Sequence, residues 1–267
     1  MPLRIGFDLD GVLADMDGEL LRQARQLFGD RVLLKSPKAQ RPAPDAQAPA
    51  AVAAVAADES DDAQDDRDIS ASPDADAVPH DPPPPALRLT SKQQRRLWRH
   101  VESIDDFWET LKETEPGIVA RLAALATQQR WEIIFLTKRP EGAGATAQVQ
   151  TQRWLASKGF ALPSVFVVQG SRGRIAAALG LDVVVDDRPE NCLDVVVDSK
   201  ARAVLVWRED VTLLPLGARR LGIGVVGTVG ECLDILMQVD AAVQERPGVI
   251  DRVMRLLGLK EPASVQG

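Results

Sequence analysis

The sequence has few of the residues that build disulfide or zinc sites. It contains two cysteines, Cys192 and Cys232, and two histidines, His80 and His100. Two cysteines make neither a disulfide framework nor a zinc site, and two isolated histidines make no catalytic or metal cluster. We expect both cysteines to be small apolar side chains within or beside helices. Thiol and imidazole ligands are therefore not expected in this chain.

Long apolar runs and an excess of basic residues are also absent. No uninterrupted apolar stretch reaches the ~20 residues that span a bilayer, and residues 1–4 lead into the first strand without the apolar core of a signal peptide. The formal net charge is −7 and the pI is about 5.0, which argues against a surface for polymeric nucleic acid. We therefore expect a cytoplasmic protein that binds a small molecule, with neither a membrane nor a nucleic acid polymer as partner.

Aromatic residues are missing from a long middle segment. Residues 36–85 are mostly Ala, Pro and Asp, and such a segment cannot bury enough apolar surface to offset the entropy of ordering the chain. We predict a disordered Ala/Pro/Asp-rich insert over 36–90. The 267 residues are 45% hydrophobic and 27% charged, which suffices for one main core and a small accessory element.

Two acidic pairs follow short apolar runs. Asp8 and Asp10 end the run that begins at Ile5, and Asp186 and Asp187 end a run of three valines. Such runs are typical of buried parallel strands, whose carboxyl ends meet at the ligand-binding edge of an open sheet. Alternate residues of a strand share a face, so Asp8 and Asp10 are expected to point the same way. Because Mg²⁺ prefers oxygen ligands, carboxylates gathered at one sheet edge predict a magnesium site.

Three strings carry a resemblance to a known family. FDLDGVLAD at 7–15 matches the first motif of the haloacid dehalogenase superfamily of phosphatases, WEIIFLT at 131–137 resembles its second motif, and VVVDDRPEN at 183–191 resembles its fourth. Within that superfamily the chain is most similar to the C-type 5′-nucleotidases, through DLDGVLAD, DDRPEN and FWETL, which leads to the string EPG. The resemblance covers roughly the first thirty residues and then the chain from about residue 95 to the C-terminus.

The third motif of the superfamily departs from its usual form. It normally supplies a lysine before the second acidic pair, and here no lysine lies between Lys158 and Asp186. Arg172 is the better placed substitute, with Arg174 as the alternative. Arginine keeps the positive charge but offers a planar fork instead of a compact ammonium, so the exchange is not neutral at a phosphate site.

The resemblance also implies roles for the acidic residues. A phosphate ester repels a carboxylate nucleophile, so a divalent cation must neutralise both. Asp8 is the expected nucleophile, which forms an aspartyl-phosphate, and Asp10 is the expected general acid and base. The resemblance implies that the metal binds the side chain of Asp8, the carbonyl oxygen of Asp10 and one carboxylate of the later pair. Whether that carboxylate is Asp186 or Asp187 stays open.

Further candidates follow the strand ends. Thr137 is expected to bind a phosphoryl oxygen through its hydroxyl, with help from backbone N–H groups of the turn at 138–140. Lys138 and Arg139 either contact the leaving group or, as is more usual for basic residues after a strand, are solvated. Arg188 either braces Asp187 or meets the substrate, whereas Glu190 and Asn191 are expected to begin a helix or turn.

The pattern predicts an α/β fold with a Rossmann-like, doubly wound parallel sheet and a small helical cap inserted after the first strand. The core domain is expected at 1–17 and 114–267, and the cap at 18–35 and 91–113. The helical segments of the cap are 18–28 and 91–111, with Ser91 as the N-cap. Later strands are expected at 165–168, 183–185, 203–206 and 223–226, and helices at 145–157, 173–179, 229–237 and 247–257. The last helix would seal the core or a homodimer contact.

Three aromatic residues, Trp98, Phe107 and Trp108, are expected to anchor the cap by core packing, with base stacking as the less favoured alternative. The sequence as a whole predicts a Mg²⁺-dependent phosphomonoester hydrolase that acts on a small phosphorylated metabolite, of which a nucleoside monophosphate is one candidate. A sugar phosphate or another phosphate ester is the alternative substrate. The alternative of another class is a catalytically silent phosphate-binding or scaffold protein that uses the acidic insert.

Overall fold

The computed structural model describes residues 2–29 and 89–245. The predicted insert at 36–90 lies outside this part of the chain except for its last two residues, and so do His80 and the predicted helix at 247–257.

The described residues form a six-stranded parallel sheet in the order β3-β2-β1-β4-β5-β6. The strands are β1 (Arg4–Asp8), β2 (Glu132–Thr137), β3 (Ser164–Val167), β4 (Val183–Asp186), β5 (Arg202–Val206) and β6 (Gly224–Val226). Strands β1 and β4 are neighbours in the sheet. In the sequence, β2 and β3 come between them, and these two strands lie on the other side of β1. The predicted doubly wound α/β sheet is confirmed, and its order reverses between β1 and β4.

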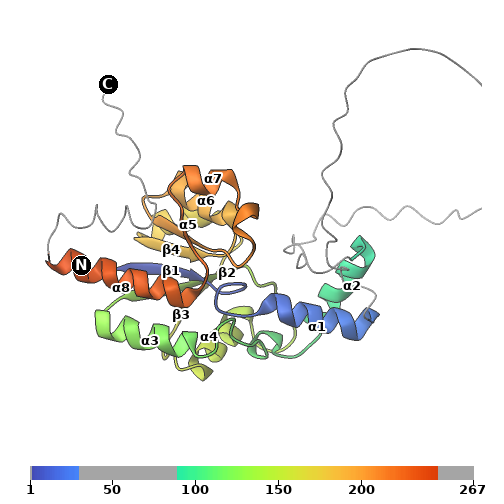
Figure 1. The fold of residues 1–267 in the computed structure, drawn as a ribbon. Coiled ribbons are helices and arrows are strands. Elements are labelled where there is room, and N and C mark those ends of the chain that lie inside the picture. Colours follow the sequence, from blue (N-terminus) through green and yellow to red (C-terminus); the bar gives the residue numbers. More distant parts are fainter. Residues whose placement is uncertain (1, 30–88, 246–267) are drawn as a thin grey trace, which may run out of the picture.

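Helices cover both faces of the sheet, as Figure 1 shows. They are α1 (Met16–Phe28), α2 (Ser91–Glu102), α3 (Ile118–Gln129), α4 (Ala147–Ser157), α5 (Arg172–Leu179), α6 (Pro189–Asp198), α7 (Leu216–Arg220) and α8 (Val229–Glu245), with short 3₁₀ helices η2 (Phe107–Glu109) and η3 (Val211–Leu213). The helix expected at 229–237 is longer than predicted and runs to Glu245.

Alternation along the strands divides the core into two layers. In β2, Ile133 and Phe135 pack with α3, α4 and α8, whereas Ile134 and Leu136 pack with α5, α6 and α7. Successive side chains of a strand point to opposite faces, so a run of apolar residues can serve both layers. Both faces of β2 are therefore buried, and polar side chains can gather only where the strands end.

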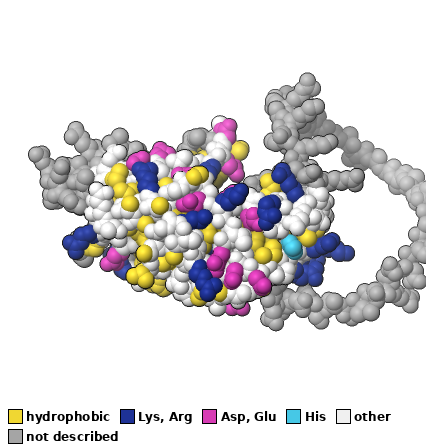
Figure 2. Space-filling view, turned by 90° about the horizontal axis from the view of Figure 1, so that it is seen from below, with side chains coloured by type: hydrophobic (Ala, Val, Ile, Leu, Met, Phe, Trp, Pro, Cys, Tyr) yellow, Lys and Arg dark blue, Asp and Glu magenta, His cyan; other side chains and the backbone are white. Residues whose placement is uncertain are grey.

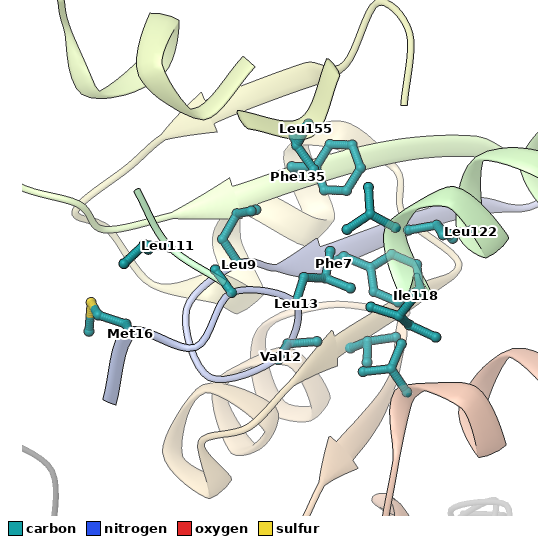
Figure 3. Packing of buried hydrophobic residues seen from close by; sticks show 14 of the residues in the cluster. Phe7, Leu9, Val12, Leu13, Met16, Leu111, Ile118, Leu122, Phe135 and Leu155 are labelled. Atoms are coloured by element: carbon teal, nitrogen blue, oxygen red, sulfur yellow. The ribbon is translucent and has the colours of Figure 1, made fainter. Parts of the chain in front are cut away.

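The loop after β1 is part of the core. Leu9, Val12 and Leu13 are fully buried, and they lie beside Phe7 in the layer that includes α3 (Figure 3). Gly11 has a φ of 83°, which suits glycine and lets the loop turn sharply between these buried side chains. The packing of the apolar residues fixes the loop, and with it the position of Asp10.

Helices α1 and α2 lie side by side at one end of the molecule (Figure 1). Their buried side chains, including Leu20, Leu97 and Val101, belong to the same cluster as those of the sheet. The exposed side of α2 carries Lys92, Arg95, Arg96 and Arg99, and Figure 2 shows basic side chains gathered at this end. The cap boundaries remain a prediction, but these two helices have no core separate from the sheet.

The segment after α2 differs from the prediction. The helix ends at Glu102 instead of continuing to residue 111, and Asp106 has a φ of 50°, in the left-handed region, before the short turn η2. Thr90, not Ser91, is the N-cap of α2, and it shares a capping box with Gln93.

The three aromatic residues near the predicted cap are buried. Trp98, Phe107 and Trp108 are each no more than 3% exposed. The expectation of core packing is confirmed for all three, so none of them offers an open face to a base.

Candidate active site

The carboxyl ends of β1, β2 and β4 meet at the point where the strand order reverses. Asp8 ends β1, Thr137 ends β2 and Asp186 ends β4, and Phe7 is in register with Val185. Ligands of open α/β sheets bind in the crevice outside the carboxyl ends at such a switch point. The structure therefore brings together three of the predicted site residues at the expected edge.

A buried arginine joins two of these strand ends. Ser171 caps the start of α5, and Arg172 is the first residue of that helix. Its Nη2 atom donates to Oδ1 of Asp8, and its Nε atom lies 3.6 Å from Oδ2 of Asp186. The side chain of Arg172 is 2% exposed, whereas Arg174 lies on the surface. Of the two candidates for the third motif, Arg172 is the one that reaches the acidic cluster.

Arg172 also has donors that are not used. Its Nε and Nη1 atoms are buried and form no hydrogen bond within the described part of the chain. Although burial lowers the pKa of Arg172, the charges of Asp8 and Asp186 raise it above its ordinary value, so the guanidinium stays charged. A buried cation whose N–H groups make no hydrogen bond destabilises a fold, so the arrangement is unusual. An anionic ligand would accept the missing hydrogen bonds.

The acidic cluster carries more negative charge than Arg172 can balance. Burial, followed by the charge of Asp186, raises the pKa of Asp8 well above its ordinary value, and Arg172 opposes the rise. Burial raises the pKa of Asp186 as well. Burial and the neighbouring Asp186 raise the pKa of Asp187 to about 7. A cation placed among these carboxylates would favour their charged forms.

Asp186 is held by groups of the loop and helix that follow it. Asn191 donates from Nδ2 to Oδ1 and Oδ2 of Asp186, at 3.0 and 3.1 Å, and the backbone N–H of Arg188 donates to Oδ1 at 2.9 Å. The Nζ atom of Lys138 lies 3.4 Å from Oδ1 of Asn191. Asn191 was expected to begin a helix or turn, and it does lie in the first turn of α6. Its contact with Asp186 was not predicted.

The carboxylate of Asp187 has an unused oxygen. Its Oδ1 atom is buried and accepts no hydrogen bond among the described residues. A Cβ atom added to Gly11 would lie 1.9 Å from Oδ2 of Asp187, so the glycine makes room for this carboxylate. Asp187 also lines a cavity of about 390 Å³, together with Gly11, Asp15, Asp17, Thr114, Val206, Trp207, Arg208 and Glu209.

Asp10 lies beyond the end of β1 and has its own arginine. Arg139 donates from Nη2 to Oδ1 at 2.7 Å and from Nε to both oxygens at 3.0 Å, and the hydroxyl of Thr137 donates to Oδ2 at 3.0 Å. The backbone N–H of Arg139 donates to the Thr137 hydroxyl instead of remaining open to a ligand. The Arg139 side chain is 0% exposed, so the expectation that it is solvated is wrong.

The ligand atoms available at this edge are of the type that a hard divalent cation prefers. Asp8, Asp186 and Asp187 offer carboxylate oxygens, one of them unused, and the excess negative charge described above would be offset by such an ion. Within residues 2–29 and 89–245, no group of three acidic, histidine or cysteine side chains is drawn together as a preformed metal site. The fit therefore rests on the chemistry of the donors.

Other parts of the described chain offer less chemistry. Burial raises the pKa of Cys232 to about 12, and burial with nearby Asp186 raises that of Cys192 well above its usual range, so neither thiol is a nucleophile. A larger groove of about 920 Å³ lies near the start of β2, where Arg4 and Glu132 pair with each other. Among the helices of the described segments, none has the length and apolar character needed to cross a membrane.

Comparison with known proteins gives a likeness in structure but none in sequence. No protein-family model matches the sequence, and no curated protein matches it. Among solved structures, the chain is similar to a putative beta-phosphoglucomutase from Thermotoga maritima, with 15% sequence identity and a TM-score of 0.46. The match covers 89% of this chain and 99% of that one.

Proposed function

We propose that this protein is a Mg²⁺-dependent phosphomonoester hydrolase of the haloacid dehalogenase type. The observation that carries the proposal is the buried contact between Asp8 and Arg172 at the switch point of the sheet. The contact puts a carboxylate nucleophile beside a cation whose Nε and Nη1 donors are unused. Phosphoryl transfer needs this combination, because the phosphoryl oxygens must be bound while the nucleophile reaches phosphorus.

The residues divide the reaction as follows. Asp8 attacks phosphorus, the bond to the leaving oxygen breaks, and Asp10 supplies the proton that this oxygen takes up. Asp10 then accepts a proton from water, which attacks the aspartyl-phosphate and frees Asp8. Arg172 and the hydroxyl of Thr137 bind phosphoryl oxygens in both steps. Lys138, half-buried beside Asn191, adds positive charge at the same edge.

The metal would be held by the side chain of Asp8, the carbonyl oxygen of Asp10 and the carboxylate of Asp187. We assign the third ligand to Asp187 because its Oδ1 atom is unused, whereas both oxygens of Asp186 accept hydrogen bonds from Asn191. A bound Mg²⁺ supplies charge neutralisation at the phosphate.

The substrate is a small phosphate ester. The resemblance to C-type 5′-nucleotidases keeps a nucleoside monophosphate among the candidates, and a sugar phosphate or another phosphate ester is the alternative. The burial of Trp98, Phe107 and Trp108 leaves none of these rings for stacking on a base, whereas Trp207 lines the cavity beside Asp187, so both substrate classes belong in the test. The presence of Asp8, Asp10 and Arg172 at one sheet edge argues against a catalytically silent scaffold.

The test is phosphate release from a panel of nucleoside monophosphates and sugar phosphates, with Mg²⁺ and with chelator. Wild type is compared with Asp8→Asn and with Asp105→Asn, a control at an exposed carboxylate. We expect metal-dependent release that is lost in Asp8→Asn and kept in Asp105→Asn. Release that survives in Asp8→Asn excludes the aspartyl-phosphate route, and no release from any compound favours the scaffold alternative.

A further inference from the structure

The Asp10 carboxylate is held more tightly than proton transfer alone requires. Three of its hydrogen bonds come from Nε and Nη2 of Arg139, and a fourth comes from Thr137. A guanidinium that meets a carboxylate edge to edge fixes the plane of the carboxylate as well as its position.

Arg139 is itself fixed from two further sides. Its Nη1 atom donates to the hydroxyl of Thr151 at 2.9 Å, and its guanidinium lies over the ring of Trp108, with Cζ at 5.0 Å from the centroid. Thr151 is completely buried and donates in turn to the carbonyl oxygen of Ala147, one turn earlier in α4. All three guanidinium nitrogens of Arg139 therefore donate hydrogen bonds, and these bonds hold the side chain in one orientation.

Helix α4 also holds the segment that carries Trp108. Gln150 accepts from the backbone N–H of Trp108 at 3.0 Å, and the Nε1 atom of Trp154 donates to the carbonyl oxygen of Leu111 at 2.8 Å. Both Gln150 and Trp154 are buried. The orientation of Asp10 is thus set by a continuous chain of contacts that runs from α4 and η2 through Arg139.

We propose that Arg139 is a positioning residue that orients the Asp10 carboxylate to accept the proton of the attacking water. This inference rests on the proposed function and concerns its second step. In that step the water oxygen bonds to phosphorus, the bond between phosphorus and Asp8 breaks, and the water proton passes to Asp10. No further reactant is needed.

A bound substrate would replace the contact of Asp10 with Thr137 and leave its contact with Arg139 unchanged. When the Thr137 hydroxyl turns to a phosphoryl oxygen, it leaves Oδ2 of Asp10 with a free acceptor position. Arg139 keeps Nη2 on Oδ1 and Nε on both oxygens, and so holds the carboxylate in place. The arrangement therefore opens one oxygen to water while the orientation is retained.

The experiment uses p-nitrophenyl phosphate with Mg²⁺ and compares wild type with Arg139→Ala and Arg139→Lys. p-Nitrophenolate is a good leaving group that needs no proton. With this substrate, kcat/KM therefore reports phosphorylation of Asp8, whereas kcat reports the slower hydrolysis of the phosphoenzyme. We expect Arg139→Ala to lower kcat by about 10²-fold and kcat/KM by less than about tenfold, with phosphoenzyme accumulating in acid-quenched samples. The kcat of Arg139→Lys should lie between those of wild type and Arg139→Ala. Equal losses in kcat and kcat/KM, without phosphoenzyme, overturn the proposal.

Two further variants keep the test decisive. Thr151→Val removes the acceptor of Nη1 with little change of shape, so it should lower kcat several-fold at constant kcat/KM even if Arg139→Ala does not fold. An unchanged kcat in Thr151→Val overturns the proposal. Arg153→Ala removes an exposed contact between α4 and Glu109 and should match wild type in both constants. If wild type forms neither p-nitrophenol nor phosphoenzyme, the proposed function itself is wrong.

Discussion

The guanidinium of Arg139 faces the carboxylate of Asp10 and donates to both of its oxygens, with Nη2 at 2.7 Å from Oδ1. Asp8, two residues earlier, is held by Arg172 instead. Each aspartate of the first motif thus has its own arginine, one from the loop after β2 and one from α5. This separation gives the two carboxylates different surroundings, which is how paired carboxylates come to have different roles.

Arg172→Ala should abolish most of the proposed phosphatase activity. The substitution removes the buried cation beside Asp8 and Asp186, so we expect kcat/KM to fall at least 10²-fold. Arg174→Ala is the matched control, because Arg174 lies on the exposed side of the same helix. Steady-state kinetics on any substrate that wild type accepts will decide. A larger loss in Arg174→Ala than in Arg172→Ala would show that the third-motif residue has been misassigned.

Gly173→Ala should reduce both stability and activity. A Cβ atom at this position would lie 2.0 Å from the carbonyl oxygen of Asp194, so α5 and α6 would have to move apart. Overpacking of this kind costs about 1 to 3 kcal/mol, and the shift would displace Arg172, which directly precedes the glycine. Gly170→Ala is the control, because nothing lies within 4 Å of its added Cβ. Thermal unfolding and kcat/KM of the two variants are the measurements, and equal behaviour would contradict the close approach.

Asp187→Asn should weaken Mg²⁺ binding more than tenfold. Calorimetric titration with Mg²⁺ measures this directly, without turnover. Asp186→Asn should instead lower the melting temperature, because Asn191 and the backbone N–H of Arg188 would lose a charged acceptor. Normal Mg²⁺ affinity in Asp187→Asn would mean that the metal is held by Asp186.

The metal-free protein should lose stability as the pH rises from about 4 to about 7. The pKa of Asp187 is raised from 3.8 to about 7 in the folded chain, so between these values the folded state binds more protons than the unfolded state. Stability from this group is complete below pH 3.8 and disappears as the pH passes 7. Asp187→Asn in the presence of chelator should flatten this part of the curve of melting temperature against pH. Parallel curves for variant and wild type would contradict the raised pKa.

The strand ends could be predicted because their signals are local. An apolar run followed by Asp or Thr predicts both a buried strand and the edge at which its polar side chain emerges, and this placed Asp8, Thr137 and Asp186 correctly. The doubly wound order follows from alternating strands and helices. Which of Arg172 and Arg174 enters the site depends on the rotation of α5 about its axis, which the sequence indicates only weakly.

The contacts that Arg139 and Asn191 make could not be predicted from such local signals. A basic residue after a strand is usually solvated, and an asparagine in the first helical turn usually caps a helix. Their contacts with Asp10 and Asp186 join segments far apart in the sequence. One signal was available for Arg139, because it follows Thr137 by two residues at the same sheet edge. The basic side of α2 was likewise hidden by the acidic average of the whole chain.

The hydrophobic cluster that α1 and α2 share with the sheet has a consequence for how this molecule can open. A lid that swings on hinges must part from its base without uncovering the interior, and here Leu20, Leu97 and Phe7 belong to one continuous interior. Lifting the two helices would expose Leu20, Leu97 and Val101, which are buried in this cluster. We therefore expect the helices and the sheet to melt as one cooperative unit in calorimetry.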